Sequence, residues 1–174
     1  MAVEADVRPR GPFSLRLSCR WGIPGRTYRD GLFAVQLAID GRVERGIAAQ
    51  RSDGSLRLRA ESEAGFDQLR FVLALDDDHG EFLRRFSRDP LIREATRRVR
   101  GLRPLRTPTV AQALLRAVCG QLIQARRARS IERTVVRALM PPLAGTRLHA
   151  PPDCAAFARL APADLDALVL PERG

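Results

Sequence analysis

Residues 101–139, GLRPLRTPTVAQALLRAVCGQLIQARRARSIERTVVRAL, decide the fold of the second half of the chain. Thr109, followed three residues later by Gln112, matches a capping box, although Thr107 before Pro108 competes as the cap. Apolar residues then recur at helical spacing, which predicts a helix with one buried stripe. The stripe consists of Val110, Leu114, Ala117, Val118 and then Gln121 or Leu122.

Residues 125–140 predict a second, strongly amphipathic helix, which Pro141 and Pro142 end. At about 100° per residue, four arginines fall in one narrow sector and four apolar residues fall opposite. An ordinary solvated face and a phosphate-binding face are both consistent with such a sector. The arginine sector holds Arg126, Arg129, Arg133 and Arg137, and the apolar side holds Ala128, Ile131, Val135 and Leu139.

Shorter helices are predicted on both sides of this pair. Upstream, residues 81–87 have helical spacing, and a further helix starts with Asp89 as its N-cap and Pro90 at its first position. Gly101 ends that helix. Downstream, Asp153 caps a short helix that runs to residue 160, and Pro162 opens another that runs to residue 170.

The first third of the chain predicts β-structure. Residues 13–19 alternate apolar and polar side chains, as a half-buried strand does. Residues 33–39 place their apolar side chains on one face, which also predicts a strand. Asp40-Gly41 is a hairpin signal, residues 42–50 return, and residues 56–61 form another strand after the turn at Asp53-Gly54. Residues 71–75 are a last strand or a helical turn, and residues 21–31 are a loop.

These patterns predict an α+β fold, in which a small antiparallel sheet with one or two helices precedes an all-helical segment. The change from strand to helix patterns falls within residues 76–105. We therefore assign residues 1–80 to an N-terminal α+β domain and residues 81–174 to a helical domain.

The net charge of the sequence is +10, and its 30 basic residues are all arginine. Codon bias explains the absence of lysine, but it does not make a chain basic. An excess of this size favours a polyanionic partner, either nucleic acid or an anionic membrane, and bidentate arginine suits nucleic acid slightly better. No apolar run reaches the roughly 18 residues that cross a bilayer, and the N-terminus lacks the pattern of a secretory signal.

The metal-binding residue types are few and scattered. Cys19, Cys119 and Cys154 have long spacings, and His79 and His149 lie far apart. We expect reduced thiols that mostly fill the core, a cytoplasmic protein, and no metal or cofactor. Three consecutive acids favour a solvated turn and a helix cap over a metal site. These acids are Asp76, Asp77 and Asp78.

Three blocks of sequence, in this order, resemble the DNA-3-methyladenine glycosylase II family of the helix-hairpin-helix glycosylase superfamily. The first is EFLRRFSRDPLIREATRRVRGLRPLR at residues 81–106. The second is LLRAVCGQLIQARRARSI at residues 114–131, and the third is AAFARLAPADLDALVL at residues 155–170. The likeness extends over roughly residues 11–174.

The resemblance implies a TATA-binding-protein-like sheet domain followed by the start of a helix-hairpin-helix glycosylase domain. Members of the family remove alkylated bases from duplex DNA by hydrolysing the N-glycosidic bond. They flip the nucleotide out of the stack and fill the gap with an apolar side chain. The Gly-Gln-Leu turn supplies that wedge, which falls on Leu122 with Gln121 beside it. Trp21 either lines a base pocket or plugs the sheet.

The family pattern continues with a Gly-rich hairpin resembling LPGIGPWTA and then a catalytic Asp, and neither occurs in this sequence. Asp164 and Asp166 lie where the family has no catalytic acid. We therefore expect no catalytic residue here, and a glycosylase domain that is truncated and inactive alone. The alternative is a non-catalytic basic module that binds DNA. Apolar helix faces left uncovered predict self-association; they carry Leu114, Val118, Val135, Leu165 and Leu168.

Overall fold

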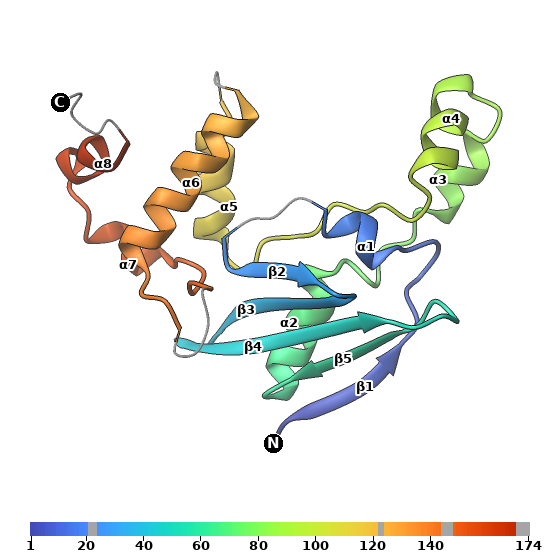
Figure 1. Ribbon diagram of the computed structural model, residues 1–174, viewed down its shortest axis with the longest axis horizontal. Helices are drawn as coiled ribbons and strands as arrows, with labels where there is room; N and C mark the ends of the chain where they lie inside the picture. The colour runs from blue at the N-terminus through green and yellow to red at the C-terminus, as the bar shows by residue number, and fades with distance from the viewer. Residues whose placement is uncertain (21–23, 122–123, 144–147, 170–174) are drawn as a thin grey trace. The chain divides into compact units, whose positions relative to one another are not determined.

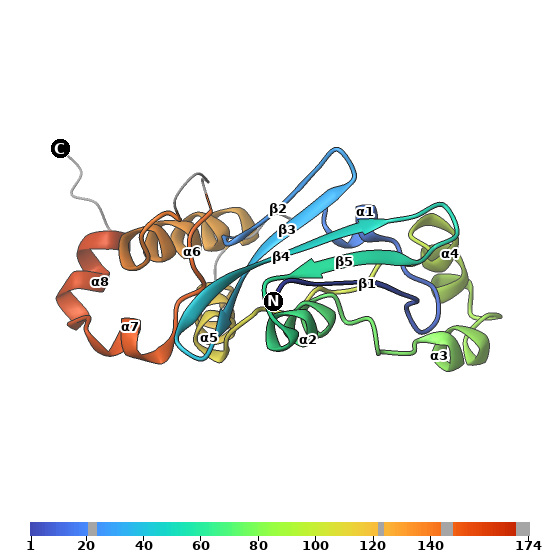
Figure 2. The ribbon, with the colours of Figure 1, turned by 90° about the horizontal axis from the view of Figure 1, so that it is seen from below.

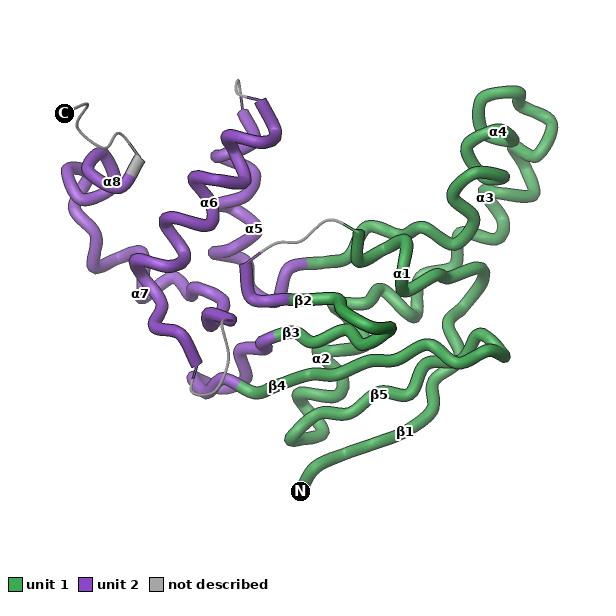
Figure 3. Tube along the Cα trace, in the orientation of Figure 1, with its two compact units in different colours: residues 1–22, 27–35, 44–106 green, residues 23–26, 36–43, 107–174 purple. Residues whose placement is uncertain are grey.

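The computed structural model describes residues 1–20, 24–121, 124–143 and 148–169 (Figure 1). Within these ranges the chain forms a five-stranded sheet and eight helices, so the predicted mixture of sheet and helix is confirmed. The chain divides into two compact units (Figure 3). Unit 1 comprises residues 1–22, 27–35 and 44–106, and unit 2 comprises residues 23–26, 36–43 and 107–174. The division into domains at residues 80 and 81 stays a prediction.

The sheet has the strand order β1-β5-β4-β3-β2. Its N-terminal strand, which we did not predict, pairs antiparallel with β5, so that Val3 lies opposite Ala60. The hairpin predicted at Asp40-Gly41 is confirmed, because both residues have a positive φ, 47° and 76°. The strands are β1 (Val3–Val7), β2 (Arg26–Arg29), β3 (Leu32–Ile39), β4 (Arg42–Gln50) and β5 (Leu56–Ala60). The loop predicted at residues 21–31 is therefore wrong for residues 26–29, which form β2.

The strand predicted at residues 13–19 is wrong, because this segment forms the short helix α1 (Leu15–Ser18). The Gln50 side chain accepts from the Leu15 N–H through its Oε1 at 2.9 Å, while its Nε2 donates to the Phe13 carbonyl at 2.9 Å. Leu15, Ser18 and Cys19 are buried, which is the i, i+3, i+4 spacing of a helix face. The Gln50 amide therefore satisfies backbone groups that a strand would have paired with a neighbour.

Helix α2 (Glu63–Val72) covers the sheet beside β1 and β5 (Figure 2). Ser62 caps it by accepting from the Gly65 N–H at 3.0 Å. The side chains of Phe66, Leu69 and Val72 are buried on its inner face. Residues 71–75 therefore contain the end of a helix, which decides between the two alternatives for that segment.

The hairpin of helices α3 (Gly80–Arg85) and α4 (Pro90–Arg98) follows. The predicted cap is confirmed, because the Asp89 carboxylate accepts from the Ile92 N–H at 3.0 Å. Gly101 lies after the end of α4 with φ 84°, and a Cβ there would lie 2.8 Å from the Ser14 nitrogen. This position therefore requires glycine both for its backbone angle and for its close approach to α1.

The three consecutive acids form the solvated turn that the sequence predicts, but the predicted cap is wrong, because the N-cap of α3 is His79. Asp76 pairs with Arg70 at 2.7 Å, and Asp77 pairs with Arg106 at 2.8 Å. The Asp78 carboxylate accepts from the backbone N–H that opens α3 at 2.7 Å. All three acids therefore stabilise the path of the chain from α2 to α3.

Unit 2 contains the four remaining helices, α5 (Val110–Cys119), α6 (Ala125–Leu139), α7 (Cys154–Ala158) and α8 (Pro162–Val169). All four are predicted by the sequence. Helix α6 packs against α5 and α8, and α7 packs against α5. In the described part of the chain, no helix has both the length and the apolar character that a bilayer crossing needs.

Candidate nucleic-acid interface

Thr109 is the N-cap of α5, as predicted. Its Oγ1 accepts from the Gln112 N–H at 3.1 Å and donates to the Pro152 carbonyl at 2.6 Å, so Thr107 is not the cap. The reciprocal bond of the predicted capping box, from the Gln112 side chain back to Thr109, does not form. The Gln112 side chain is buried and donates to the Pro24 carbonyl at 3.2 Å instead of returning to Thr109.

The buried stripe predicted along α5 is also wrong. Val110, Leu114 and Val118 are 72%, 59% and 64% exposed. The buried residues of α5 are Ala111 and Gln112, whereas Leu114 and Val118 line an open cavity that the other helices of unit 2 also border. Helical periodicity identifies which residues share a face, and it leaves open whether another element covers that face.

The turn after α5 contains the proposed wedge. Gly120 ends the helix with φ −79°, an ordinary right-handed conformation, so a left-handed glycine does not shape this turn. Gln121 is exposed and is one of the residues that line a cavity of unit 2. Leu122 lies outside the described residues, as does Trp21.

The cavity in unit 2 has a volume of about 550 Å³ and lies among α5, α6, α7 and α8. Its described lining is almost entirely apolar and contains no aspartate or glutamate. Two of the three cysteines line it, Cys119 half-buried and Cys154 exposed, so only Cys19 is the core residue that the sequence predicts. The lining also includes Leu115, Val118, Ile131, Val135, Phe157 and Leu165.

Helix α6 has the two faces that its sequence predicts. Arg126, Arg133 and Arg137 are exposed, and within the described residues none of them forms an ion pair. Arg129 is half-buried, and its Nε donates to the Ala125 carbonyl at 3.0 Å. On the opposite face Ala128 and Val135 are buried, while Ile131 and Leu139 are half-buried.

Glu132, the one acidic residue of α6, points inward and is only 2% exposed. Burial raises the pKa of this carboxyl above its ordinary value of 4.5, against the attraction of Arg116 and Arg26. Burial, with a smaller contribution from Glu132, also raises the pKa of the Cys119 thiol. The exposed surface of α6 therefore carries arginines and no acid. The sequence signal for this arrangement, which we missed, was a lone glutamate within one turn of Val135.

Unit 1 contains a buried arginine that we also did not predict. Arg103 is 2% exposed, and its guanidinium lies over the Phe13 ring at 5.4 Å. Burial lowers the pKa of Arg103, and the nearby charges of Asp77 and Asp78 oppose this change. Its guanidinium donates to four backbone carbonyls: Ala74 at 2.8 Å, Asp77 at 2.8 Å, Pro12 at 3.1 Å, and Arg10.

Several solved structures share this fold. The 3-methyladenine DNA glycosylase from Archaeoglobus fulgidus matches with a TM-score of 0.80 at 17% identity, over 95% of this chain and 62% of that one. A structure of MBOgg1 with a low-affinity DNA ligand matches with a TM-score of 0.73 at 18% identity, over 95% and 57% of the two chains. The 8-oxoguanine glycosylase/lyase of Clostridium acetobutylicum, in complex with double-stranded DNA, matches with a TM-score of 0.71 at 18% identity, over 97% and 59%.

No protein-family model and no curated protein matches the sequence. The structural matches confirm that this chain has the fold of the DNA glycosylases, as its resemblance to that superfamily implies. The chain spans between 57% and 62% of the length of these three glycosylases.

Proposed function

We propose that this chain is a DNA-repair protein of the glycosylase type, which binds duplex DNA through the exposed arginines of α6. The observation that carries the proposal is the one-sided charge of that helix. Its only acid is buried, and its surface presents Arg126, Arg133 and Arg137 without an ion pair among the described residues. An ordinary solvated helix places acids three or four residues from its arginines, and α6 does not do so on its exposed surface.

The physical consequence is a salt-dependent affinity. Each arginine that meets a phosphate releases counterions, and the logarithm of affinity then falls with the logarithm of salt concentration with a slope of about −0.9 per contact. Arginine suits this role because its planar guanidinium donates two parallel hydrogen bonds to one phosphate. Arg129 is less available than the other three, because it is half-buried and already donates to the Ala125 carbonyl.

The test measures duplex binding over a salt series with two triple variants. One replaces Arg126, Arg133 and Arg137 with Gln, and the other replaces the exposed Arg16, Arg29 and Arg42, which removes the same charge elsewhere. The slope is that of the logarithm of affinity against the logarithm of salt concentration. We expect the α6 triple to make it less steep by up to about 2.7, and the control triple to leave it unchanged. Equal slopes for the two triples would contradict the proposal.

The substrate class that we propose is duplex DNA with alkylated purines. The support is the likeness of the fold to the archaeal 3-methyladenine DNA glycosylase, together with the family resemblance of residues 81–106 and 114–131. The sheet of unit 1 would then be the TATA-binding-protein-like domain of that family. Tighter binding to a duplex containing 3-methyladenine than to the same unmodified duplex supports this substrate class, and equal affinity contradicts it.

Gln121 and Leu122 are the residues that we propose for the wedge. Gln121 is exposed beside a helix end, a place from which a side chain can enter the minor groove. Leu122→Ala should reduce the fluorescence change of a 2-aminopurine placed beside the lesion, while the salt slope stays unchanged. An unchanged fluorescence signal would remove the wedge from the proposal and leave the arginine face intact.

We also propose that the chain on its own does not release bases. A glycosylase needs a carboxylate at the sugar, and the described lining of the unit 2 cavity has none. The same observation favours the second candidate function, a non-catalytic basic module that grips duplex DNA. Release of 3-methyladenine or 7-methylguanine by the purified chain would exclude that candidate and overturn the proposed inactivity.

Two further proposals concern the state of the protein in the cell. The exposed Leu114 and Val118 support self-association, whereas Val135 is buried and cannot contribute. Sedimentation that stays monomeric at high concentration would exclude it. A cytoplasmic location rests only on the cysteine pattern, and imaging of the tagged chain in its host tests it.

A further inference from the structure

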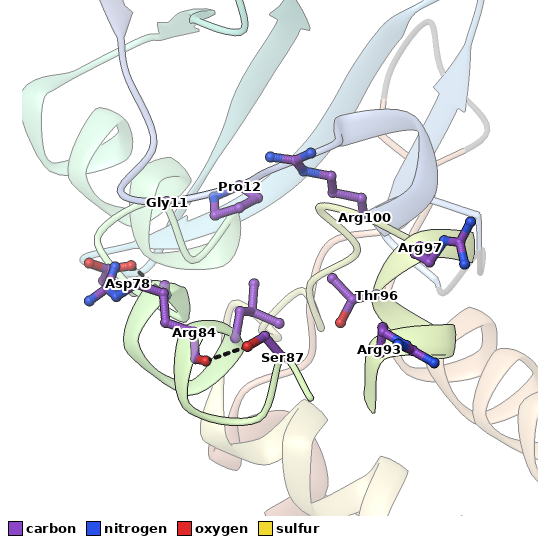
Figure 4. Close-up of a pocket in the computed structure, with 11 residues that line it drawn as sticks. Gly11, Pro12, Asp78, Arg84, Ser87, Arg93, Thr96, Arg97 and Arg100 are labelled. Carbon is purple, nitrogen blue, oxygen red and sulfur yellow. Dashed lines mark hydrogen bonds between the residues drawn. The ribbon is translucent and has the colours of Figure 1, made fainter. Parts of the chain in front are cut away.

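A second arginine-rich surface lies on unit 1, in the hairpin of α3 and α4. It surrounds a cavity of about 810 Å³ whose lining is drawn in Figure 4. Four arginines belong to this lining, together with a single acid, Asp78. The arginines are Arg84, Arg93, Arg97 and Arg100.

The charges of this cavity are unbalanced. The Asp78 carboxylate is already engaged, because it accepts from the Gly80 N–H at 2.7 Å. Among the residues that the structure describes, none of the four lining arginines forms an ion pair. Arg98 of α4, which does not line the cavity, pairs with Glu94 at 2.7 Å.

The sequence of α4 separates the two kinds of arginine. Residues 93 and 97 share one helical face, whereas residues 94 and 98 lie roughly 100° away on another. Arg100 follows just after the end of the helix. The face with an acid–base pair is internally neutral, and the face toward the cavity is purely cationic.

The arrangement of the guanidinium groups indicates the shape of the partner. Figure 4 shows Arg84 beside Asp78 on one side, Arg93 and Arg97 extending from α4 on the other, and Arg100 reaching toward Pro12. A small anion would need donors that converge on one point. Cations spread around a rim fit an extended polyanion, which brings several phosphates to different points of the rim.

We infer that this rim is a second binding surface for the phosphodiester backbone of nucleic acid, separate from the α6 arginines. The inference rests on the proposed function, because it assumes that the chain binds duplex DNA. It adds a contact in unit 1, where the arginines would hold the backbone without reading its sequence.

The experiment compares two triple variants of the same hairpin in the full chain. The cavity triple changes Arg84, Arg93 and Arg97 to Gln. The control triple changes Arg85, Arg88 and Arg98, which are exposed and do not line the cavity. Duplex affinity is measured over a salt series for both, and chemical denaturation confirms that both fold like the parent chain.

We expect the cavity triple to reduce the salt slope by about 0.9 for each phosphate that no longer meets an arginine, up to about 2.7, with no change in the control triple. A cavity triple that matches the control overturns the inference. If the Arg126, Arg133 and Arg137 triple then still lowers the slope, the proposed function survives. If the parent chain shows no salt-dependent binding, both fail. The inference is also overturned if inorganic pyrophosphate stabilises the chain against denaturation while the cavity triple leaves the salt slope of duplex binding unchanged. The ligand of the cavity would then be a small phosphate.

Discussion

Two regions of the chain differ in what their apolar residues contact. One is strand β5 of unit 1 with its covering helix α2, and the other is helix α5 of unit 2. In β5, Leu56, Leu58 and Ala60 are buried as their alternation predicts, and α2 covers them. In α5 the spacing is equally regular and the Thr109 side chain caps the helix, yet Leu114 and Val118 are more than half exposed.

This difference shows that secondary structure and burial are separate questions. Capping and periodicity act over a few residues, and both regions satisfy them. Burial of an apolar face requires an element that packs against it. In unit 1 the covering helix follows its strand immediately, whereas in unit 2 Leu114 and Val118 border a cavity that the described residues of α6, α7 and α8 leave unfilled.

The largest effect on stability that we expect comes from Arg103, which is buried in unit 1. Arg103→Met keeps an apolar stem but leaves four backbone carbonyls without their donor. We expect a loss of about 3–5 kcal/mol in the free energy of unfolding, measured by chemical denaturation. Arg88→Met, at an exposed position, is the control and should change stability by less than about 0.5 kcal/mol. Equal effects at the two positions would show that the buried hydrogen bonds contribute little.

A pair of leucine substitutions tests the comparison directly. Leu58→Ala removes a fully buried side chain and should destabilise the protein by about 2–5 kcal/mol. Leu114→Ala changes the same number of atoms at a position that is 59% exposed and should cost less than about 0.5 kcal/mol. Denaturation of both variants at low protein concentration measures the difference. A large loss for Leu114→Ala would mean that α5 has a covering partner in solution, such as a second copy.

Much of the fold could be predicted because its signals are local. Each of these signals depends on residues that are close together in sequence. They are the strand at β5, the turn at Asp40-Gly41, the cap at Asp89 and the two faces of α6. The error at α1 has a cause that is not local. Leu15 and Cys19 fit a spacing of two and a spacing of four equally well, and the deciding contact comes from Gln50.

The buried polar residues could not be predicted, because burial depends on partners that lie far away in sequence. Arg103 is one arginine among thirty, and its acceptors lie near residues 10–12 and 74–77. Glu132 has the sequence surroundings of a surface residue until its neighbours one turn away, Ala128 and Val136, are known to be buried. The arginine face of α6 was predictable, and the only sequence signal for the absence of acid from that face was the lone Glu132 within one turn of Val135.

The cap of α5 tests how far local signals stabilise unit 2. Thr109→Ala removes the acceptor for the Gln112 N–H and the donor to the Pro152 carbonyl. We expect a loss of about 1–2 kcal/mol in the free energy of unfolding. Thr109→Ser, which keeps the hydroxyl, should retain most of the stability. If the Ala and Ser variants unfold together, the cap is not what holds the start of this helix.

The smallest effect should come from Glu132, and it should depend on pH. Its pKa is raised in the folded chain, so between its ordinary value of 4.5 and its folded value the unfolded chain binds fewer protons. The contribution of Glu132 to the stability of the parent chain therefore falls as pH rises through that window, by at most about 1.4 kcal/mol per pH unit. Glu132→Gln should flatten this part of the curve, because an amide keeps the shape of the side chain without a titrating proton. Denaturation midpoints from about pH 4 upward, compared with those of Asp166→Asn at an exposed position, measure the change. If the parent chain instead gains stability relative to Glu132→Gln as pH rises, Arg116 and Arg26 stabilise the Glu132 carboxylate more than burial penalises it.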